Sequence, residues 1–340
     1  MNMNWEKPVV VITGASSGIG KAAAIRFAEE GARLVLAARR KNLLQDLAQH
    51  CNGLGADAIA VECDVSDQSD VEGLARKAIR HFGRIDVWVN DAGVSTIGRF
   101  DEVPMRESEQ VIHTNLLGVM YGSRAAIRHF RETSRRGVLI NIASVLGKSP
   151  APYQAAYVAS KHAIVGLGGA IRQELWANGE RDIHVCTIMP PSINTPFFRH
   201  AANHSGHRVE PIPPVYAPEQ VAEAIVQTAW RPRDEVSIGG TGKLMNFQQK
   251  LSKKLSEKHM ALHTHTTQIK KAAPEGDRSG ILFKPSSEGA DVRDEWSESG
   301  KYADAVGAAI GTAIPVAIGF WLWRRFSEPE TEREEIMPAA

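Results

Sequence analysis

Tyr157 and Lys161 lie four residues apart in the stretch QAAYVASKHAIVG. On a helix, residues at this spacing share one face. Reducing a carbonyl by hydride transfer places charge on its oxygen, so a proton donor must lie within hydrogen-bond reach. Tyrosine is a weak acid with a reference pKa of about 10, but an ammonium at about 4 Å favours the phenolate by up to ~4 kcal/mol at an effective dielectric of ~20. The pair predicts an acid–base centre in which lysine lowers the pKa of tyrosine; a chance pair on a solvated surface is the alternative.

Ser144 follows an apolar run and precedes Tyr157 by 13 residues. Its hydroxyl is placed to hold a substrate oxygen beside the phenol, although a serine there also suits a helix or turn cap. A serine hydrolase is a weaker interpretation, because no G-x-S-x-G elbow surrounds Ser144.

The sequence TGASSGIG, residues 13–20, ends an apolar run and leads into a helical pattern with Gly14, Gly18 and Gly20. Glycines at such a turn let the backbone approach a pyrophosphate, which then lies on the N–H groups of the helix start. A P-loop is excluded by spacing, because Ala15 stands at its first glycine position and Ala22 follows Lys21. The turn therefore predicts a dinucleotide-binding site.

Ala38, Arg39 and Arg40 stand at the end of the second apolar run, where an acidic residue would bind an adenosine ribose. A carboxylate there would repel a 2′-phosphate, whereas a guanidinium binds it in a bidentate manner. These residues favour NADP(H) over NAD(H). The alternative is that Arg39 only opens a helix into solvent.

Strand-length apolar runs alternate with helical patterns along the first 240 residues. The runs cover 9–13, 33–39, 58–65, 85–91, 137–144, 183–190 and 235–240. Runs of this kind indicate strands buried on both faces, as in parallel sheets. We expect an α/β fold: a Rossmann-type doubly wound parallel sheet of about seven strands with helices on both faces, plus a helical C-terminal extension.

The joint set of TGASSGIG, CDV at 63–65, NDAG at 90–93, Asn115, Ser144, Tyr157 and Lys161 resembles the short-chain dehydrogenase/reductase family, non-extended branch, over roughly residues 7–240. The resemblance implies a catalytic group of Asn115, Ser144, Tyr157 and Lys161. In it Tyr157 is the general acid/base, Lys161 also bonds the nicotinamide ribose, and Asn115 holds a water for proton return. The implied cofactor-binding residues are Gly14, Ser16, Ser17, Gly18, Ile19, Gly20, Arg39, Asp64, Val65, Asn90, Ala92, Gly93, Tyr157, Lys161, Pro190 and Thr195.

Two residues depart from the family pattern: Asp91, where a second Asn is usual, and Pro191, where a Gly usually follows Pro190. Because fold does not dictate activity, a non-catalytic NADP-binding regulator is the alternative to an enzyme. We expect the segment after Thr195 to be a lid, with Phe197 and Phe198 either lining an apolar substrate pocket or packing the lid down.

Charge is nearly balanced, with 40 Lys+Arg against 39 Asp+Glu, so nothing indicates a nucleic-acid partner. Three cysteines far apart fit a reducing compartment, and the absence of a charged and then apolar leader favours a cytoplasmic catalytic domain. The family implies a homo-oligomer. We predict no metal site, because the histidine groups His200, His204, His207 and His259, His263, His265 lack Cys or carboxylates at matching spacing.

The chain divides into a catalytic domain (1–240), a basic amphipathic helical segment (241–271), a polar linker (272–304), an apolar segment (305–323) and a charged tail (324–340). The apolar segment has 19 residues without a charge and would span about 28 Å as a helix. We expect membrane attachment through it, with a buried oligomerisation helix as the alternative.

Overall fold

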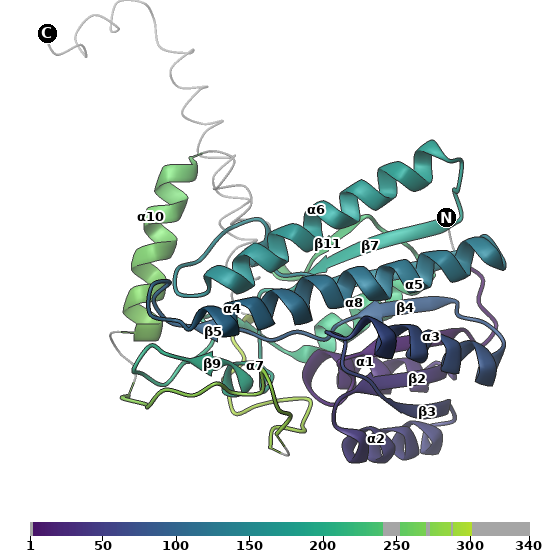
Figure 1. Ribbon diagram of the computed structural model, residues 1–340, viewed down its shortest axis with the longest axis horizontal. Coiled ribbons are helices and arrows are strands. Elements are labelled where there is room, and N and C mark those ends of the chain that lie inside the picture. The colour runs from purple at the N-terminus through teal and green to yellow at the C-terminus, as the bar shows by residue number, and fades with distance from the viewer. Residues whose placement is uncertain (1–2, 241–251, 270–272, 287, 301–340) are drawn as a thin grey trace, which may run out of the picture.

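The structure is a computed structural model and describes residues 3–240, 252–269, 273–286 and 288–300. Its centre is a seven-stranded sheet with the strand order β11-β7-β6-β4-β1-β2-β3 (Figure 1). Every neighbouring pair is parallel. The strands are β1 (Val9–Thr13), β2 (Arg33–Ala38), β3 (Asp57–Glu62), β4 (Val87–Asn90), β6 (Gly137–Ile142), β7 (Ile183–Met189) and β11 (Glu235–Ser237). The predicted fold class is confirmed, and the strands end up to three residues earlier than the apolar runs do.

Helices connect the strands and cover both faces of the sheet (Figure 1). They are α1 (Gly18–Glu29), α2 (Lys41–Gly53), α3 (Gln68–Phe82), α4 (Met105–Ile112), α5 (Gly118–Glu132), α6 (Ala155–Ala177), α7 (Phe197–His200) and α8 (Pro218–Trp230). A π-helical turn, η1 (His113–Leu117), joins α4 to α5, and a short 3₁₀ turn, η2 (Val145–Gly147), follows β6. The strand order reverses between β1 and β4, and in open α/β sheets such a point forms a crevice at the carboxyl ends of the strands.

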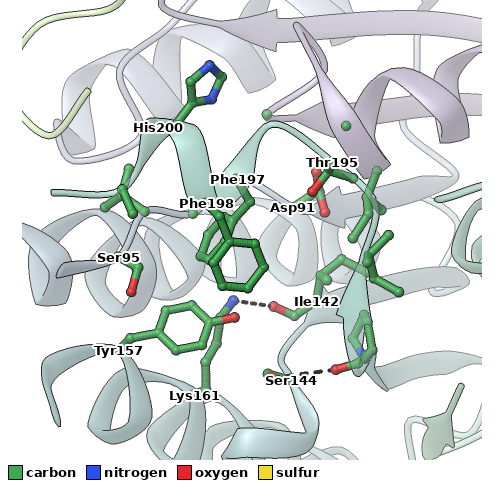
Figure 2. A pocket seen from close by; sticks show the side chains of 18 of the residues that line it. Asp91, Ser95, Ile142, Ser144, Tyr157, Lys161, Thr195, Phe197, Phe198 and His200 are labelled. Atoms are coloured by element: carbon green, nitrogen blue, oxygen red, sulfur yellow. Dashed lines mark hydrogen bonds between the residues drawn. The ribbon is translucent and has the colours of Figure 1, made fainter. Parts of the chain in front are cut away.

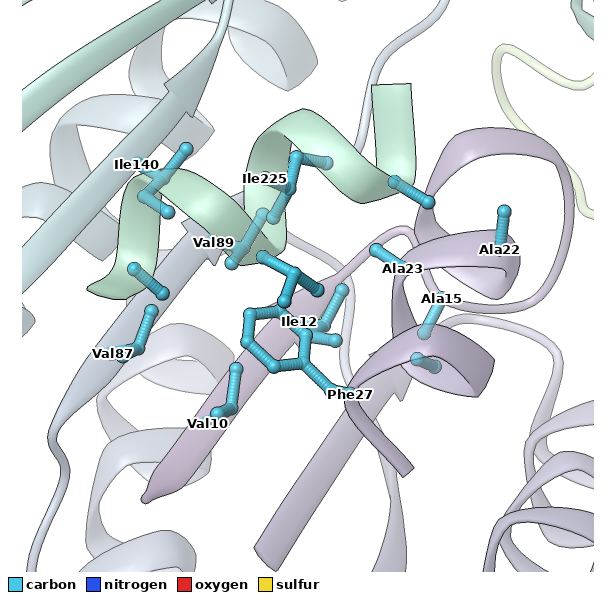
Figure 3. Close-up of a cluster of buried hydrophobic side chains, with 14 of the residues drawn as sticks. Val10, Ile12, Ala15, Ala22, Ala23, Phe27, Val87, Val89, Ile140 and Ile225 are labelled. Atoms are coloured by element: carbon cyan, nitrogen blue, oxygen red, sulfur yellow. The ribbon is translucent and has the colours of Figure 1, made fainter. Parts of the chain in front are cut away.

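The two faces of β1 show why its sequence is continuously apolar. Val10 and Ile12 pack in the cluster that contains Phe27 of α1 and Ile225 of α8 (Figure 3). Val11 faces the opposite layer, which is formed by α3, α5 and α6. Alternate side chains of one strand thus enter two hydrophobic layers, and neither face can be polar.

Short pairs of strands and two C-terminal segments lie at the carboxyl edge of the sheet. β5 (Thr96–Ile97) pairs with β9 (Ala202–Asn203), and β8 (Ser192–Ile193) pairs with β10 (Val215–Tyr216). Residues 273–286 and 288–300, here called the strap, form no helix or strand of the fold but pack against this edge, where Arg278 bridges Asn203. The stretch predicted to be a linker is thus attached to the catalytic domain over its described length.

The remaining described helix is α10 (Lys253–Thr264), which continues into the π-helical turn η3 (His265–Ile269). Both lie within the predicted helical segment 241–271. The apolar segment 305–323 and the charged tail lie outside the described residues. Within the described ranges, no helix is both long and apolar enough to cross a bilayer.

Candidate active site

A cavity of about 490 Å³ opens where the carboxyl ends of the central strands meet. It runs from the glycine turn after β1 to Tyr157 and Lys161 on α6 and on to Phe197 and Phe198 at the start of α7. Figure 2 shows the part of the cavity around Tyr157, Lys161 and the two phenylalanines. This volume is typical of sites for small molecules. Residues predicted independently from the sequence therefore share one enclosed space.

The glycine turn brings two stretches of backbone closer than any side chain would allow. A Cβ on Gly14, which has a φ of +75°, would lie 2.7 Å from the Ala92 nitrogen. A Cβ on Gly20 would lie 2.6 Å from the Gly14 oxygen and 2.8 Å from a carboxylate oxygen of Asp91. The start of α1 is therefore bare main chain facing the cavity, which fits the binding of a pyrophosphate.

This geometry makes Gly20 intolerant of substitution. We expect Gly20→Ala to lower the melting temperature by several degrees and to weaken dinucleotide binding at least about tenfold, because the added carbon overlaps main-chain atoms. Gly166→Ala is the matched control: nothing lies within 4 Å of its Cβ position in α6, so it should gain up to about 1 kcal/mol of helix stability. Differential scanning fluorimetry and a dinucleotide titration measure both effects. Equal behaviour of the two variants would contradict the predicted cradle.

Tyr157 and Lys161 lie one turn apart on α6, which begins at Ala155, and both line the cavity. The Lys161 Nζ donates a hydrogen bond of 2.8 Å to the oxygen of Ile142 at the end of β6 and lies 5.5 Å from the centre of the Tyr157 ring. Figure 2 shows the phenol hydroxyl and the ammonium pointing into the same part of the cavity. The spacing of four residues therefore places both side chains on one face of α6.

The electrostatics differ from the expectation for the tyrosine. Burial raises the pKa of Tyr157 to about 12, and the Asp91 charge adds to the rise, while a hydrogen bond with the Ser144 side chain opposes it. Burial also lowers the pKa of Lys161 to about 8, against the Asp91 charge, which raises it. Desolvation therefore outweighs the attraction that we expected to lower the tyrosine pKa. In this structure Tyr157 is a neutral phenol, which is a proton donor.

Ser144 follows β6 by two residues and performs the capping role considered for it, while its role toward a substrate oxygen stays a prediction. Its Oγ accepts a hydrogen bond of 3.1 Å from the Leu146 nitrogen and so caps the turn η2. The same hydroxyl lines the cavity and is close enough to Tyr157 to influence its pKa. Capping fixes the orientation of the hydroxyl and leaves it facing the substrate space.

Asn115 lies in the π-helical turn η1 and is fully buried. Its Oδ1 accepts from the Val94 nitrogen (2.8 Å), and its Nδ2 donates to the Val94 oxygen (2.9 Å) and the Ser160 Oγ (3.1 Å). The side chain therefore ties the loop after β4 to α6. Its predicted water-holding role stays a prediction.

Both departures from the family pattern, Asp91 and Pro191, line the cavity, and Asp91 brings a charge into it. Burial raises the pKa of its carboxyl to about 7, while Lys161 and a hydrogen bond from the Gly20 N–H lower it. The carboxyl lines the cavity between the glycine turn and Lys161. The sequence marks Asp91 only as a departure from the family pattern, but in the structure it belongs to the same buried charge group as the Tyr157–Lys161 pair.

The cavity separates the predicted cofactor residues into two sets. Those that line it are Gly14, Ser16, Ser17, Gly18, Ile19, Arg39, Asp64, Val65, Ala92, Gly93, Tyr157, Lys161, Pro190 and Thr195. Gly20 and Asn90 do not line it. The Asn90 side chain turns into the fold, where it accepts from the Trp88 indole (2.7 Å) and donates to the Asn141 Oδ1 (2.8 Å). An amide at that position thus joins β4 to β6.

The predicted histidine groups have separate partners. His204 contacts Glu107 at 2.7 Å, His200 contacts the Glu288 oxygen at 3.1 Å, and His259 stacks on His263. Across the described part of the chain, no three His, Cys, Asp or Glu side chains come together as a metal site requires.

Sequence reasoning missed the walls that the C-terminal segments contribute. Ile281 and Pro285 of the strap line the cofactor half of the cavity, and Ser256, His259, Met260 and His263 of α10 line the far end. No periodicity or motif in these residues signals a contact with the glycine turn more than 240 positions earlier.

Residues 8–205 match the family described as short chain dehydrogenase, which is more than half of the chain. The chain belongs to the short-chain dehydrogenase family. This confirms the predicted family. YxnA, an uncharacterized oxidoreductase of Bacillus subtilis, is 38% identical over 255 residues, which are 74% of this chain and 71% of YxnA. The 3beta-hydroxysteroid dehydrogenase 1 of Eggerthella lenta is 36% identical over 239 residues, 68% of this chain and 89% of that protein.

Solved structures of this short-chain dehydrogenase's relatives agree with its fold. An alcohol dehydrogenase from the archaeon Thermococcus sibiricus, complexed with 5-hydroxy-NADP, has a TM-score of 0.59 and 27% identity over 68% of this chain and 96% of that one. A short-chain dehydrogenase/reductase from Burkholderia phymatum in complex with NAD has a TM-score of 0.67 and 24% identity, over 75% and 97% respectively. Each of these two proteins is complexed with a nicotinamide dinucleotide of its own, and the second structure, at 24% identity, supports the fold alone.

Proposed function

We propose that this short-chain dehydrogenase is an NADP(H)-dependent oxidoreductase that transfers a hydride between nicotinamide and a carbonyl or secondary alcohol. The observation that carries the proposal is the shared cavity. Tyr157, Lys161 and Ser144 face it from one side and the bare start of α1 faces it from the other. A proton donor, a cation and a dinucleotide cradle are thereby held around one substrate space.

In the proposed reduction, the Ser144 hydroxyl holds the substrate oxygen, and Tyr157 gives it a proton. A bound nicotinamide dinucleotide would supply the hydride. Lys161 stabilises the phenolate that Tyr157 leaves behind, since its ammonium faces the same part of the cavity. Asn115 holds the loop that follows β4 against α6, the helix that carries Tyr157 and Lys161.

The preference for NADP(H) is supported by the two arginines that follow β2. Arg39 lines the cavity beside Asp64, 3.9 Å away, and the Arg40 Nε donates to the Ser16 Oγ at 3.0 Å. Their guanidinium groups therefore lie next to the glycine turn, where an adenosine 2′-phosphate would bind. The Asp64 carboxylate beside Arg39 would instead favour an unphosphorylated ribose.

An apolar substrate is supported by the wall opposite the acid–base pair. Phe197 packs on the Tyr157 ring with 5.5 Å between ring centres, and Phe198, Ile212 and Met260 also line the cavity. Two relatives are named as hydroxysteroid dehydrogenases: the protein from Eggerthella lenta and 11-beta-hydroxysteroid dehydrogenase 1A of Arabidopsis thaliana. We therefore place a bulky apolar carbonyl or alcohol in this space.

The experiment that tests the function is oxidation of NADPH and of NADH by the full chain in the presence of a carbonyl panel that includes ketosteroids. We expect turnover with NADPH and a higher kcat/KM than with NADH. Tight NADPH binding without turnover of any member would support the alternative of a non-catalytic NADP-binding regulator. The assay would also identify the substrate class.

The pH dependence follows from the lysine. Because burial lowers the pKa of Lys161 to about 8, its ammonium is lost as the pH rises through that value, while Tyr157 keeps its proton to about pH 12. We expect kcat/KM for reduction to be level near pH 7 and to fall above about pH 8, since this parameter reports the free enzyme. Rates from pH 6 to 10 measure it. A profile that stays level to pH 10 would exclude this role for Lys161.

Asp91 sets the pH at which kcat/KM falls on the alkaline side of the profile, here called the alkaline limb, because its negative charge raises the pKa of Lys161. We expect Asp91→Asn to move the limb to lower pH by about one unit. Asp64→Asn is the matched control: it removes a carboxylate from the same cavity but none that affects Lys161, so the limb should stay in place. An unchanged limb in Asp91→Asn would show that the two charges do not interact.

Attachment to a membrane through 305–323 and assembly into a homo-oligomer complete the proposal. Carbonate extraction of the full chain against a chain that ends at residue 300 tests the first, and size-exclusion chromatography with light scattering tests the second.

A further inference from the structure

The strap covers the two arginines that follow β2 with main-chain carbonyl oxygens rather than with side chains. Arg39 donates to the oxygens of Ile281 (2.5 Å) and Leu282 (3.2 Å). Arg40 donates through Nη1 to the oxygens of Ser286 (3.2 Å), Glu288 (3.0 Å) and Gly289 (3.4 Å). The two guanidinium groups proposed to bind a 2′-phosphate are therefore held by neutral oxygens of the same chain.

The strap also reaches the start of α1. The Gly18 N–H donates to the Asp291 oxygen at 2.9 Å, and the Lys21 Nζ donates to the Ala290 oxygen at 2.9 Å. These are donors of the kind that bind phosphate at a helix N-terminus. Successive main-chain oxygens of the strap therefore contact the arginines after β2 and then the glycine turn.

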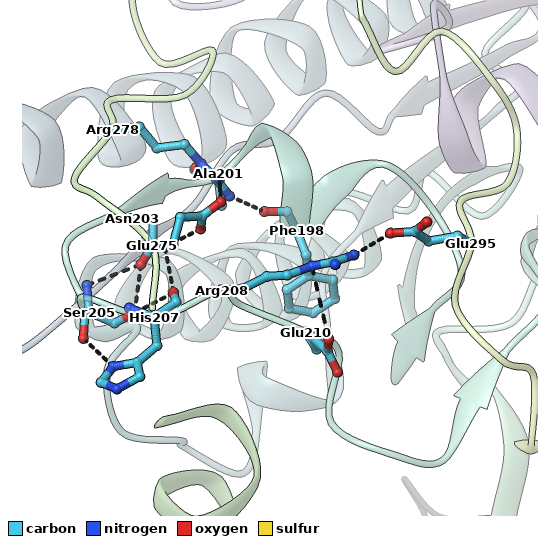
Figure 4. Close-up of polar contacts among 10 residues, drawn as sticks. All are labelled: Phe198, Ala201, Asn203, Ser205, His207, Arg208, Glu210, Glu275, Arg278 and Glu295. Atoms are coloured by element: carbon cyan, nitrogen blue, oxygen red, sulfur yellow. Dashed lines mark hydrogen bonds and ion pairs between the residues drawn. The ribbon is translucent and has the colours of Figure 1, made fainter. Parts of the chain in front are cut away.

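The N-terminal part of the strap is anchored outside the proposed dinucleotide-binding region. The Ser279 hydroxyl donates at 2.6 Å to Glu107, which is 1% exposed and also contacts His204. Arg278 donates to the carbonyl oxygens of Phe198 and Ala201, both at 3.3 Å (Figure 4). These bonds fix the strap to α4 and to the proposed substrate lid.

The other end is anchored independently. Arg293 forms a two-point ion pair with Glu219 of α8, and Asp294 forms one with Arg199. The indole of Trp296 packs in the cluster that contains Phe198. Figure 4 shows the neighbouring pair of Arg208 and Glu295. The segment between the anchors can therefore leave the proposed dinucleotide-binding region while both ends stay in place.

Between the anchors, Leu282 is the one strap side chain in the core of the site. It is 1% exposed and packs with Val94, Val111 and Ala202, with Tyr157 at the edge of the cluster. Glycines with positive φ stand at both sides of this segment, Gly280 at +51° and Gly289 at +64°. A side chain at Gly289 would meet the His200 ring, because its Cβ would lie 2.3 Å from Nε2.

We propose that strap residues 281–286, 288 and 289 are an internal competitor for the adenosine 2′-phosphate and are displaced from Arg39 and Arg40 when a 2′-phosphorylated dinucleotide binds. This inference rests on the proposed NADP(H) preference. It assigns part of the discrimination between the two dinucleotides to a segment outside the matched family region 8–205.

The direction of the exchange follows from the charges. A phosphate carries negative charge and binds guanidinium in bidentate geometry, so its hydrogen bonds are shorter and stronger than those of a neutral carbonyl. The 2′-hydroxyl of NAD(H) offers no such replacement, so the arginines would keep their strap partners. At Arg39 and Arg40 the strap therefore opposes binding of both dinucleotides, and only the 2′-phosphorylated one recovers that loss.

Hydrogen exchange of the full chain tests the competition with two small probes. Adenosine 2′,5′-bisphosphate carries the 2′-phosphate, and adenosine 5′-monophosphate is its matched control. At saturation of each, we expect faster exchange in peptides covering 281–289 with the bisphosphate only, while the anchors at 275–279 and 293–299 stay protected. Residues 290 and 291 should respond to both probes, because their oxygens occupy donors at the start of α1 and both probes carry a 5′-phosphate. With the bisphosphate, slower exchange in 281–289 would show a lid that closes over the ligand, and unchanged exchange would show no linkage; either result overturns the proposal.

A substitution in the strap tests whether the strap lowers the affinity for a 2′-phosphorylated ligand. Leu282→Ala should loosen the strap and tighten bisphosphate binding about tenfold, with a smaller effect on the monophosphate, because the binding-competent fraction rises. Phe283→Ala, at a neighbouring position that is 47% exposed, is the control and should leave both affinities unchanged. Equal affinities in Leu282→Ala and the parent chain would overturn the proposal. Failure of the bisphosphate to bind any of the three proteins would overturn it together with the NADP(H) preference, whereas carbonyl reduction with NADH would still support the oxidoreductase.

Discussion

Replacing Tyr157 with phenylalanine is expected to lower kcat for carbonyl reduction by about 10²- to 10⁴-fold, the range for loss of a general acid. The hydroxyl is the group that burial keeps protonated, with a pKa of about 12, at the point where Ser144 and Lys161 converge. Phenylalanine keeps the ring that packs on Phe197. NADPH binding, measured by fluorescence titration, should stay within about twofold of the parent chain.

Tyr153→Phe is the matched control for this change. Its hydroxyl contacts the His265 ring at 2.8 Å and is not part of the cavity wall. We expect activity within about threefold of the parent chain. If both tyrosine variants lose activity equally, or if Tyr157→Phe retains it, Tyr157 is not the proton donor.

The sheet and the position of the acid–base pair are predictable because each depends on local sequence. The run at 9–13 is apolar from Val9 to Ile12, since both faces of β1 are covered, and the spacing of Tyr157 and Lys161 places them on one face of α6 whatever surrounds that helix. These two features need no knowledge of distant residues. The glycine turn is recognisable from its own spacing, although the structure shows that Gly14 and Gly20 are also required by the approach of Ala92 and Asp91 from a distant part of the chain.

The features that were not predictable depend on contacts between distant parts of the chain. The pKa of Tyr157 is decided by how deeply the cavity is enclosed, which no spacing reveals. Asn90 was assigned to the cofactor by resemblance, yet its amide turns toward Trp88 and Asn141, because a strand residue can face either side of a sheet. The polarity of the strap indicates a linker, but its main-chain oxygens are the atoms that bind Arg39 and Arg40, and main-chain oxygens carry no sequence signature.

Replacing Lys161 with methionine is expected to separate catalysis from stability. Without the ammonium, the phenolate formed at Tyr157 loses its stabilising charge, and kcat should fall by about 10²- to 10³-fold, as when one electrostatic donor is removed from an active site. Lys148→Met is the control, because Lys148 pairs with Glu235 and does not line the cavity. It should leave kcat within about twofold of the parent chain.

Stability should change in the opposite sense. The folded-state pKa of Lys161 is lowered from 10.5 to about 8 by burial, so its charge destabilises the fold fully below pH 8, and this penalty disappears as the pH rises to about 10.5. Methionine carries no such penalty, although it leaves the Ile142 oxygen without its donor. We therefore expect Lys161→Met to melt at or above the parent temperature at pH 7 and to lose that advantage toward pH 10. A variant that melts well below the parent chain at pH 7 would show that Lys161 holds the fold together, and its loss of activity would then say nothing about proton transfer.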